Sequence, residues 1–169
     1  VQTCALPILI RAVRREPANS EEIRWQPLIP ASQISAPQKE AFEGLHAVIH
    51  LAGENIAGGR WNSARKKRIR ESRETATANL CDLLTSLKSP PAHFISASAI
   101  GGYDQTLATA QTEETPFVGG FLGEVCSSWE NASLPLEAAG IRRALLRIGL
   151  VLTPRGGVLQ KLIPIFKAC

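Results

Sequence analysis

The chain has 169 residues, of which 44% are hydrophobic and 20% charged, which is the balance of a single globular domain. No apolar segment reaches the roughly 18 residues that a membrane span requires. The net charge of +4 permits nucleic-acid binding but gives no specific argument for it. Four widely spaced cysteines without a C-x-x-C pair favour a reduced, cytoplasmic protein, and we expect no metal site.

The two ends of the chain have unusual sequences. Residues 1–8 read VQTCALPI, which is the translation of a common sequencing adaptor, and the chain contains no Met. We therefore expect residues 1–8 to be non-native and residues 9–169 to be a partial domain. The last residues, LIPIFKAC, stop in the middle of a helical pattern. The sequence is therefore expected to be a fragment cut at both ends.

Apolar runs and turn residues divide the chain into alternating strands and helices. The predicted strands cover residues 9–15, 23–28, 46–51, 93–98 and 141–153. The predicted helices cover residues 62–89, residues 121–140 with a kink at Pro135, and the chain from residue 154 onward. Because residues 46–51 form a nearly continuous apolar run, we expect this strand to be buried on both faces.

This alternation predicts an α/β fold with a parallel sheet and right-handed crossovers. In such sheets, ligands bind at the carboxyl ends of the strands. The three strongest strands end in LAGEN, SASAIGGY and RIGLVLTPRGG, each rich in Gly, Ala or Ser. Small residues let a ligand approach the backbone closely, so these three ends predict one binding surface.

Six segments carry a resemblance to a known family. They read HAVIHLAGENIAGGRW, RESR, FISASAIGGY, TEETP, FLGEVCSSWE and LLRIGLVLTPRGGVLQKLIPIF. In this order they resemble the atypical, epimerase-like branch of the extended short-chain dehydrogenase/reductases, a branch of predicted nucleoside-diphosphate-sugar epimerases. The resemblance covers Leu9 to Phe166 and implies an NADP(H)-binding, Rossmann-like parallel sheet with flanking helices. It also implies an incomplete fold, without the first strand and its glycine-rich loop and without the C-terminal substrate region.

The resemblance implies a set of cofactor-binding residues. They are Arg14, Arg15, Leu51, Ala52, Gly53, Arg73, Ser96 and Ala97. An arginine at the end of the second strand selects the 2′-phosphate of NADP, and Arg15 matches that arginine better than Arg14 does. The alternatives are a solvated basic strand end at Arg15 and a simple turn at Gly53.

The resemblance also places catalytic and substrate-side residues. Ser98 matches the serine that hydrogen-bonds the reacting oxygen, although it could simply end a strand. The Tyr and Lys that normally assist this serine are replaced by Leu122 and Cys126, which puts standard epimerase or dehydrogenase chemistry in doubt. Tyr103, the only tyrosine, is either an alternative acid or a substrate-contact or packing residue. The substrate-side residues implied are Glu54, Asn55 and Gly149.

The run RKKRIRESR, residues 65–73, is strongly basic, but we interpret it as a solvated helix face and expect no nucleic-acid partner and no membrane partner. The function predicted for the parent is that of an NADP(H)-dependent oxidoreductase or sugar-nucleotide epimerase-like protein with a small-molecule substrate, nucleotide-linked compounds being the first candidates. The chain itself is expected to be an inactive fragment. The alternative is a non-catalytic dinucleotide-binding sensor or interaction module.

Overall fold

The computed structural model describes residues 8–104, 106, 108–153 and 157–167, so most of the predicted non-native segment lies outside the described residues. The strands are β1 (Arg11–Val13), β2 (Glu22–Arg24), β3 (Ala47–His50), β4 (His93–Ala99) and β5 (Arg142–Ile148). The helices are α1 (Ala36–Glu40), α2 (Ser63–Glu71), α3 (Glu74–Thr85), α4 (Phe121–Asn131), α5 (Pro135–Ala138) and α6 (Gly157–Lys167). Two short 3₁₀ helices are η1 (Ala31–Gln33) and η2 (Ile100–Gly102).

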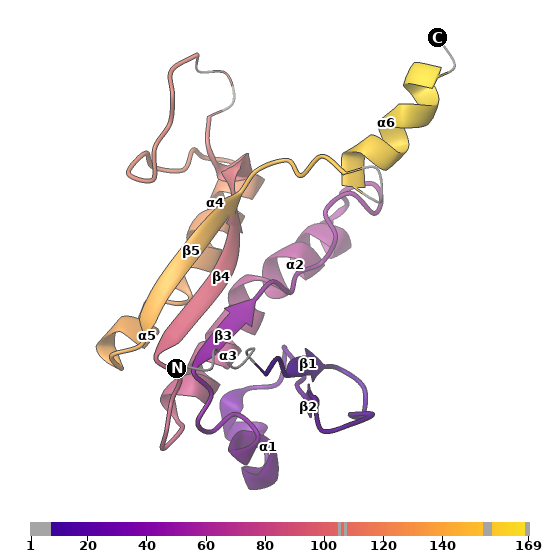
Figure 1. Ribbon diagram of the computed structural model, residues 1–169. Helices are drawn as coiled ribbons and strands as arrows, with labels where there is room; N and C mark the ends of the chain where they lie inside the picture. Colours follow the sequence, from indigo (N-terminus) through magenta and orange to yellow (C-terminus); the bar gives the residue numbers. More distant parts are fainter. Residues whose placement is uncertain (1–7, 105, 107, 154–156, 168–169) are drawn as a thin grey trace, which may run out of the picture.

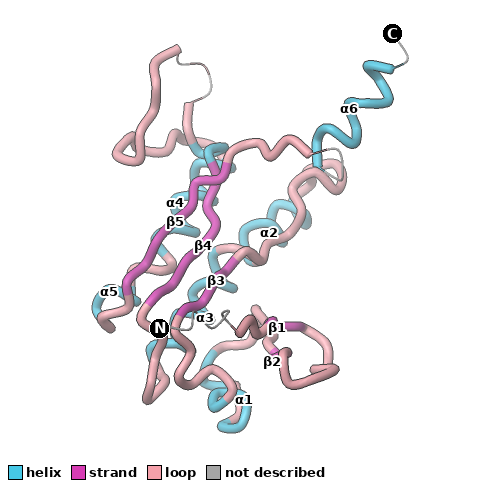
Figure 2. The backbone as a smooth tube through the Cα atoms, viewed as in Figure 1, coloured by secondary structure: helices cyan, strands magenta, loops and turns pink. Residues whose placement is uncertain are grey.

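The strands form two separate parallel sheets (Figure 1). β1 pairs with β2, whereas β3, β4 and β5 form a three-stranded sheet with β4 in the centre. The register aligns Ala47 with His93 and His93 with Arg142, so the three strands run side by side from their first residues. The predicted parallel α/β fold is confirmed. Figure 2 shows α6 projecting beyond the carboxyl ends of β3–β5.

The described helices cover one face of the three-stranded sheet. Phe94, Ser96 and Ser98, which share one face of β4, are buried, and Phe94 belongs to the same apolar cluster as α3; Ala97 between them is buried as well. On β3, Ile49 is 58% exposed. The prediction that residues 46–51 are buried on both faces is therefore wrong, because no described helix packs against that second face.

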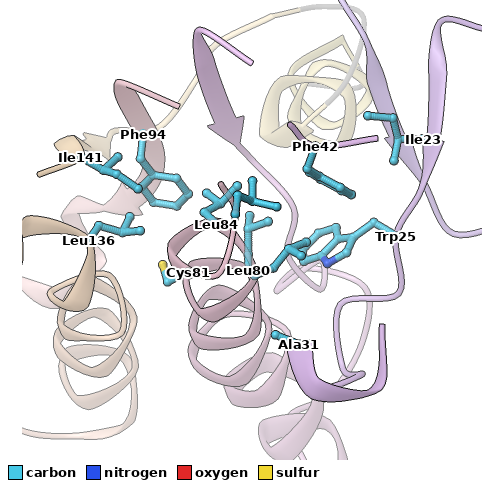
Figure 3. Close-up of a cluster of buried hydrophobic side chains, with 12 residues drawn as sticks. Ile23, Trp25, Ala31, Phe42, Leu80, Cys81, Leu84, Phe94, Leu136 and Ile141 are labelled. Carbon is cyan, nitrogen blue, oxygen red and sulfur yellow. The ribbon is translucent and has the colours of Figure 1, made fainter. Parts of the chain in front are cut away.

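The core lies between the sheet and α3 (Figure 3). Leu80 and Leu84 of α3 meet Phe94 of β4, while Trp25 and Phe42 bring the N-terminal segment against the same helix. Each of these side chains is nearly inaccessible to solvent. Full burial of a large apolar side chain contributes about 1.5–3 kcal/mol to stability. Because α3 packs against side chains from both parts of the chain, it is the element that joins the two sheets.

Both long helices predicted from the sequence are divided. The first begins as expected, since the Asn62 side chain accepts a hydrogen bond from the Arg65 N–H at 2.9 Å. It breaks between α2 and α3, where the Ser72 hydroxyl donates to the carbonyl of Ile69 at 3.1 Å. The second divides into α4 and α5 just before Pro135, whose nitrogen has no hydrogen to donate.

Candidate functional site

The carboxyl ends of β3, β4 and β5 lie at one edge of the sheet, as parallel strands require. Three of the segments predicted to bind a ligand begin there: Leu51–Gly53 after β3, η2 after β4 and Gly149 after β5. A side chain at Gly149 would lie 3.6 Å from the Ile100 Cδ1 atom, so the last two segments are in contact.

A cavity of about 720 Å³ lies between the β1–β2 unit and the end of β3. Its lining includes Ala12, Arg14, Leu51, Ala52, Gly53 and Ser72. The structure thus brings one of the two predicted arginines together with the small residues after β3. The volume of the cavity falls in the range of about 300–1,000 Å³ that is usual for small-molecule sites.

Arg14 and Arg15 have different surroundings. Arg15 donates to both carboxylate oxygens of the buried Glu22 at 2.7 Å, and Glu22 also accepts from the Ala18 N–H at 2.9 Å. The hydrogen bond from Arg15, followed by that from Ala18, lowers the pKa of Glu22 to about 2. The guanidinium of Arg15 is therefore already paired, whereas Arg14 lines the cavity. Arg15, which matches the family's arginine better by sequence, is therefore the one whose charge is neutralised by Glu22.

Arg73 lies directly against Gly53. Its guanidinium donates to the carbonyls of Glu54 and Ile69 at 3.1 and 3.2 Å and stacks over the Trp129 ring at 5.1 Å. Burial lowers the pKa of Arg73. A Cβ atom on Gly53 would stand 3.2 Å from the Arg73 Cζ atom, so the small residue leaves room for this guanidinium.

Glu54 and Asn55 are held against α2. The Glu54 carboxylate lies 3.9 and 3.8 Å from Arg65 and Arg68. The Glu54 backbone N–H donates to the Ser72 hydroxyl at 2.9 Å. The Asn55 side chain accepts from the N–H two residues later, which is a local turn. These contacts give both residues a structural role in fixing the loop after β3.

The two serines of β4 point into the covered side of the sheet. The Ser98 hydroxyl donates to the Glu130 Oε1 atom of α4 at 2.5 Å, and the Ser96 hydroxyl donates to the carbonyl of Ala97 at 3.1 Å. Ser98 is 3% exposed and does not line the cavity. The structure therefore separates Ser98 from the cavity-lining residues around Arg14.

Hydrogen bonds connect Tyr103 to Ser98 through Arg147 and Glu130, two residues that the sequence analysis did not identify. Arg147 of β5 donates from Nε and Nη2 to the two oxygens of Glu130, each at 2.9 Å, and from Nη1 to the Tyr103 phenol. The phenol in turn donates to the carbonyl of Thr112 at 2.8 Å. Arg147 stands between Leu146 and Ile148 on β5, and a charged side chain between apolar neighbours needs a partner, which is the available signal for Arg147.

Leu122 and Cys126, which replace the Tyr–Lys pair, are both on α4. The Leu122 Cδ1 atom would lie 3.7 Å from a side chain at Gly101, and the Cys126 Sγ atom is 3.7 Å from the carbonyl of Ala99. Burial raises the pKa of the Cys126 thiol. Neither side chain has the properties of a general acid at neutral pH.

Two of the comparisons with known proteins find the same family. No family model matches the chain. An epimerase family protein of Mycobacterium bovis is 38% identical over 158 residues, which are 94% of this chain and 50% of that protein. The structure of a nucleoside-diphosphate sugar epimerase from Corynebacterium glutamicum matches with a TM-score of 0.74 and 34% identity, over 95% of this chain and 32% of that one. The chain belongs to the epimerase-like branch of the extended short-chain dehydrogenase/reductases.

A third similar protein is the human epimerase family protein SDR39U1, solved with NADPH. It matches with a TM-score of 0.76 and 26% identity, over 93% of this chain and 50% of that one. The chain spans about half the length of the curated epimerase family proteins it matches. The incomplete Rossmann-like fold expected from the family motifs is thus confirmed.

The basic run on α2 takes part in ion pairs and in contacts with an aromatic ring. Lys67 lies 3.7 Å from Glu71, and Arg70 lies 2.9 Å from Glu124 of α4. The Lys66 ammonium lies 5.2 Å from the centre of the Phe121 ring, a contact between segments far apart in sequence.

Metal-binding clusters and membrane-spanning helices are both absent from the described residues. No group of three His, Cys, Asp or Glu side chains in this part of the epimerase-like chain could hold a metal ion. Within it, too, every helix is too short or too polar to cross a membrane.

Proposed function

We propose that the chain forms the dinucleotide-binding part of an NADP(H)-dependent oxidoreductase or sugar-nucleotide epimerase-like protein, and that its 169 residues alone do not turn over substrate. The observation that carries the proposal is the cavity between the β1–β2 unit and the end of β3. The NADPH bound by the human relative supports the same assignment. For the parent we propose a small-molecule substrate, with nucleotide-linked compounds as first candidates.

The cavity residues fit a dinucleotide. Ala52 and Gly53 are exposed and have little or no side chain, so a ligand can lie against their backbone. Arg14 adds a positive charge to the same wall, and Leu28 and Leu51 add apolar surface. When bound, the dinucleotide would supply or accept a hydride. We assign Leu51, Ala52 and Gly53 to cofactor contact on this basis.

The choice between NADP and NAD depends on the arginines. A guanidinium binds a phosphate through charge-assisted hydrogen bonds, each contributing about 1.5–3 kcal/mol. Arg14 lines the cavity, whereas Arg15 is paired with Glu22. We therefore propose Arg14 as the first contact of the 2′-phosphate, with Arg15 holding the strand end in place.

A non-catalytic sensor or interaction module remains the second candidate. It is favoured by the side chains of Leu122 and Cys126, which offer no acid or base where the family's usual pair would stand. Ser98 and Tyr103 are the proposed catalytic residues in the first candidate. Both donate their hydroxyl protons to acceptors within the protein, Glu130 and Thr112, so a substrate must displace one of these bonds.

The test is a titration of NADPH and NADH against a chimera in which residues 9–167 replace the matching half of the Mycobacterium bovis relative. We expect tighter binding of NADPH, and we expect Arg14→Ala to weaken it about tenfold without affecting NADH. Arg142→Ala, an exposed arginine on β5, is the matched control. Equal affinity for both dinucleotides would refute the NADP assignment, and no binding would refute the function.

Turnover separates the two candidates. Reduction of a carbonyl substrate by the chimera with NADPH, lost in Ser98→Ala, supports the oxidoreductase. Tight NADPH binding without turnover, unaffected by Ser98→Ala, supports the sensor.

A further inference from the structure

One ion pair, Glu130 with Arg147, connects the two proposed catalytic side chains. Glu130 is on α4 and Arg147 is on β5, and their side chains are 12% and 21% exposed. The two hydrogen bonds of 2.9 Å are parallel and bidentate, the geometry that best orients a guanidinium. A half-buried pair of this kind is costly to break because either partner alone would leave an uncompensated charge.

Each partner holds one hydroxyl. Glu130 accepts a hydrogen bond from the Ser98 hydroxyl at 2.5 Å, and Arg147 donates a hydrogen bond to the Tyr103 phenol. Arg147 is further fixed by the Phe117 ring, whose centre lies 4.4 Å from its Cζ atom, and by the carbonyl of Glu113 at 2.8 Å. The Ser98 and Tyr103 side chains are therefore positioned by the Glu130–Arg147 pair and not by contact with each other.

The electrostatics keep the pair charged. The hydrogen bond to Glu130 is the main cause that raises the pKa of Arg147, with Tyr103 adding to it. Burial acts to raise the pKa of Glu130, but the hydrogen bonds from Arg147 and Ser98 outweigh it and the net direction is down. Both groups thus stay ionised at neutral pH, and the arrangement around them is held by two full charges.

We propose that Glu130 and Arg147 are positioning residues, which hold the Ser98 hydroxyl and the Tyr103 phenol as one unit for the reaction at the carboxyl edge of the sheet. This inference rests on the proposed function for its chemistry, since Ser98 and Tyr103 are the groups assigned there. A change at Ser98 is transmitted through Glu130 and Arg147 to the phenol, although Ser98 has no hydrogen bond to Tyr103.

A neighbouring pair supplies the structural comparison. Arg143 lies four residues before Arg147 on the same strand, and its Nε atom donates to the Glu137 carboxylate at 2.5 Å. It joins β5 to the helical layer as Arg147 does, and its Nη1 atom also donates to the carbonyl of Glu130 at 3.2 Å. Among the described contacts, Glu137 bonds neither Ser98 nor Tyr103, so Glu137→Gln removes an ion pair one contact away from the proposed unit and leaves the hydrogen bonds among Ser98, Glu130, Arg147 and Tyr103 in place.

The single tyrosine makes the test specific. Biosynthetic 3-fluorotyrosine gives one fluorine resonance, which reports Tyr103 alone. In the 169-residue chain we expect Ser98→Ala to move this resonance by more than its line width, and Glu130→Gln to move it further or split it. Glu130→Asp, which keeps the charge, should restore part of the original position, and Glu137→Gln should leave it in place.

The outcomes are separable from those of the proposed function. An unchanged resonance in Ser98→Ala overturns the coupling, even if Glu130→Gln fails to fold, and so does an equal shift in Glu137→Gln. In the chimera, Glu130→Gln should leave the dissociation constant for NADPH unchanged while lowering kcat. Because the fluorine measurement needs no cofactor, failure of NADPH binding would refute the proposed function without affecting the positioning unit.

Discussion

Mild acid should destabilise the fold through one buried histidine, His50. Its ring lies at the end of β3 with the Nε2 atom 3.1 Å from the Thr77 hydroxyl, and the rings of Trp25 and Phe94 lie 5.8 and 6.3 Å away, centre to centre. Only 3% of the residue is exposed, and burial lowers its pKa from 6.5 to about 4. A protonated imidazolium has no carboxylate here to pair with in these contacts, so protonation opposes folding.

The magnitude follows from the two pKa values of His50. The difference of about 2.5 units between the unfolded and folded states corresponds to about 3 kcal/mol. Because the folded-state pKa is the lower one, the unfolded chain takes up the proton first as the pH falls. The stabilisation is therefore fully present above about pH 6.5 and is lost down to about pH 4. By about pH 4.5, the free energy of unfolding should have fallen by about 2.5 kcal/mol.

The carboxylates whose pKa values are lowered in the folded chain affect its stability mainly below this interval. The pKa of Glu22 is lowered to about 2, and the pKa values of Glu43, Asp104 and Glu130 are also lowered. Their stabilisation is present above the carboxylate pKa values of the unfolded chain, which are 4.5 for Glu and 3.8 for Asp, and is lost mainly below them. The interval from about pH 6.5 to 4.5 thus reports chiefly on His50.

The assay is urea unfolding followed by tryptophan fluorescence at a series of pH values. His50→Gln keeps a polar partner for Thr77 without a titrating ring, so its free energy of unfolding should be nearly constant over this interval. His46→Gln, at an exposed histidine, should keep the wild-type slope. A wild-type curve that is flat from about pH 6.5 to 4.5, or an equal slope in His50→Gln, would refute the reasoning.

Two further predictions concern packing and thiol reactivity. Gly123→Ala places a Cβ atom 1.7 Å from the Val118 carbonyl oxygen, so thermal unfolding should show a loss of about 3 kcal/mol or more, against about 0.5 kcal/mol or less for Gly119→Ala, which meets no atom within 4 Å. Burial raises the pKa of Cys81 to about 12 and also raises that of Cys126. Mass spectrometry after iodoacetamide treatment should therefore find both unmodified in the folded chain and modified in urea; rapid modification of Cys126 in the folded state would contradict this.

The sequence predicts the strands well because each is a local apolar run between turn residues. The runs at 93–98 and 141–153 correspond to β4 and to β5, which ends earlier, at Ile148. Which faces are covered is a different matter, since it depends on helices elsewhere in the chain. A continuous apolar run such as that around Ile49 is compatible with either one or two covered faces, and here there is one.

Long-range contacts explain what the sequence could not provide. The division between α2 and α3 occurs where Ser72 accepts a hydrogen bond from the Glu54 N–H, 18 residues away, and nothing local predicts that contact. Glu130 and Arg147 are 17 residues apart on different elements, so their pairing is visible only once β5 and α4 are packed. Which of Arg14 and Arg15 is available to a ligand likewise depends on the position of Glu22, which pairs with Arg15.

Two features of the structure favour a glycine at Gly53: the nearby Arg73 guanidinium and the cavity that its backbone lines. From the sequence, its small size was explained by a dinucleotide passing over the end of β3. In the structure a side chain there would meet Arg73, which is not among the residues lining the cavity, while the Gly53 backbone does line it. The guanidinium holds the loop carbonyl of Glu54 and stacks on Trp129 of α4, so the strand end is fixed from the helical side. A glycine that accommodates this support leaves the backbone both exposed and rigid, and that combination is what close approach of a ligand requires.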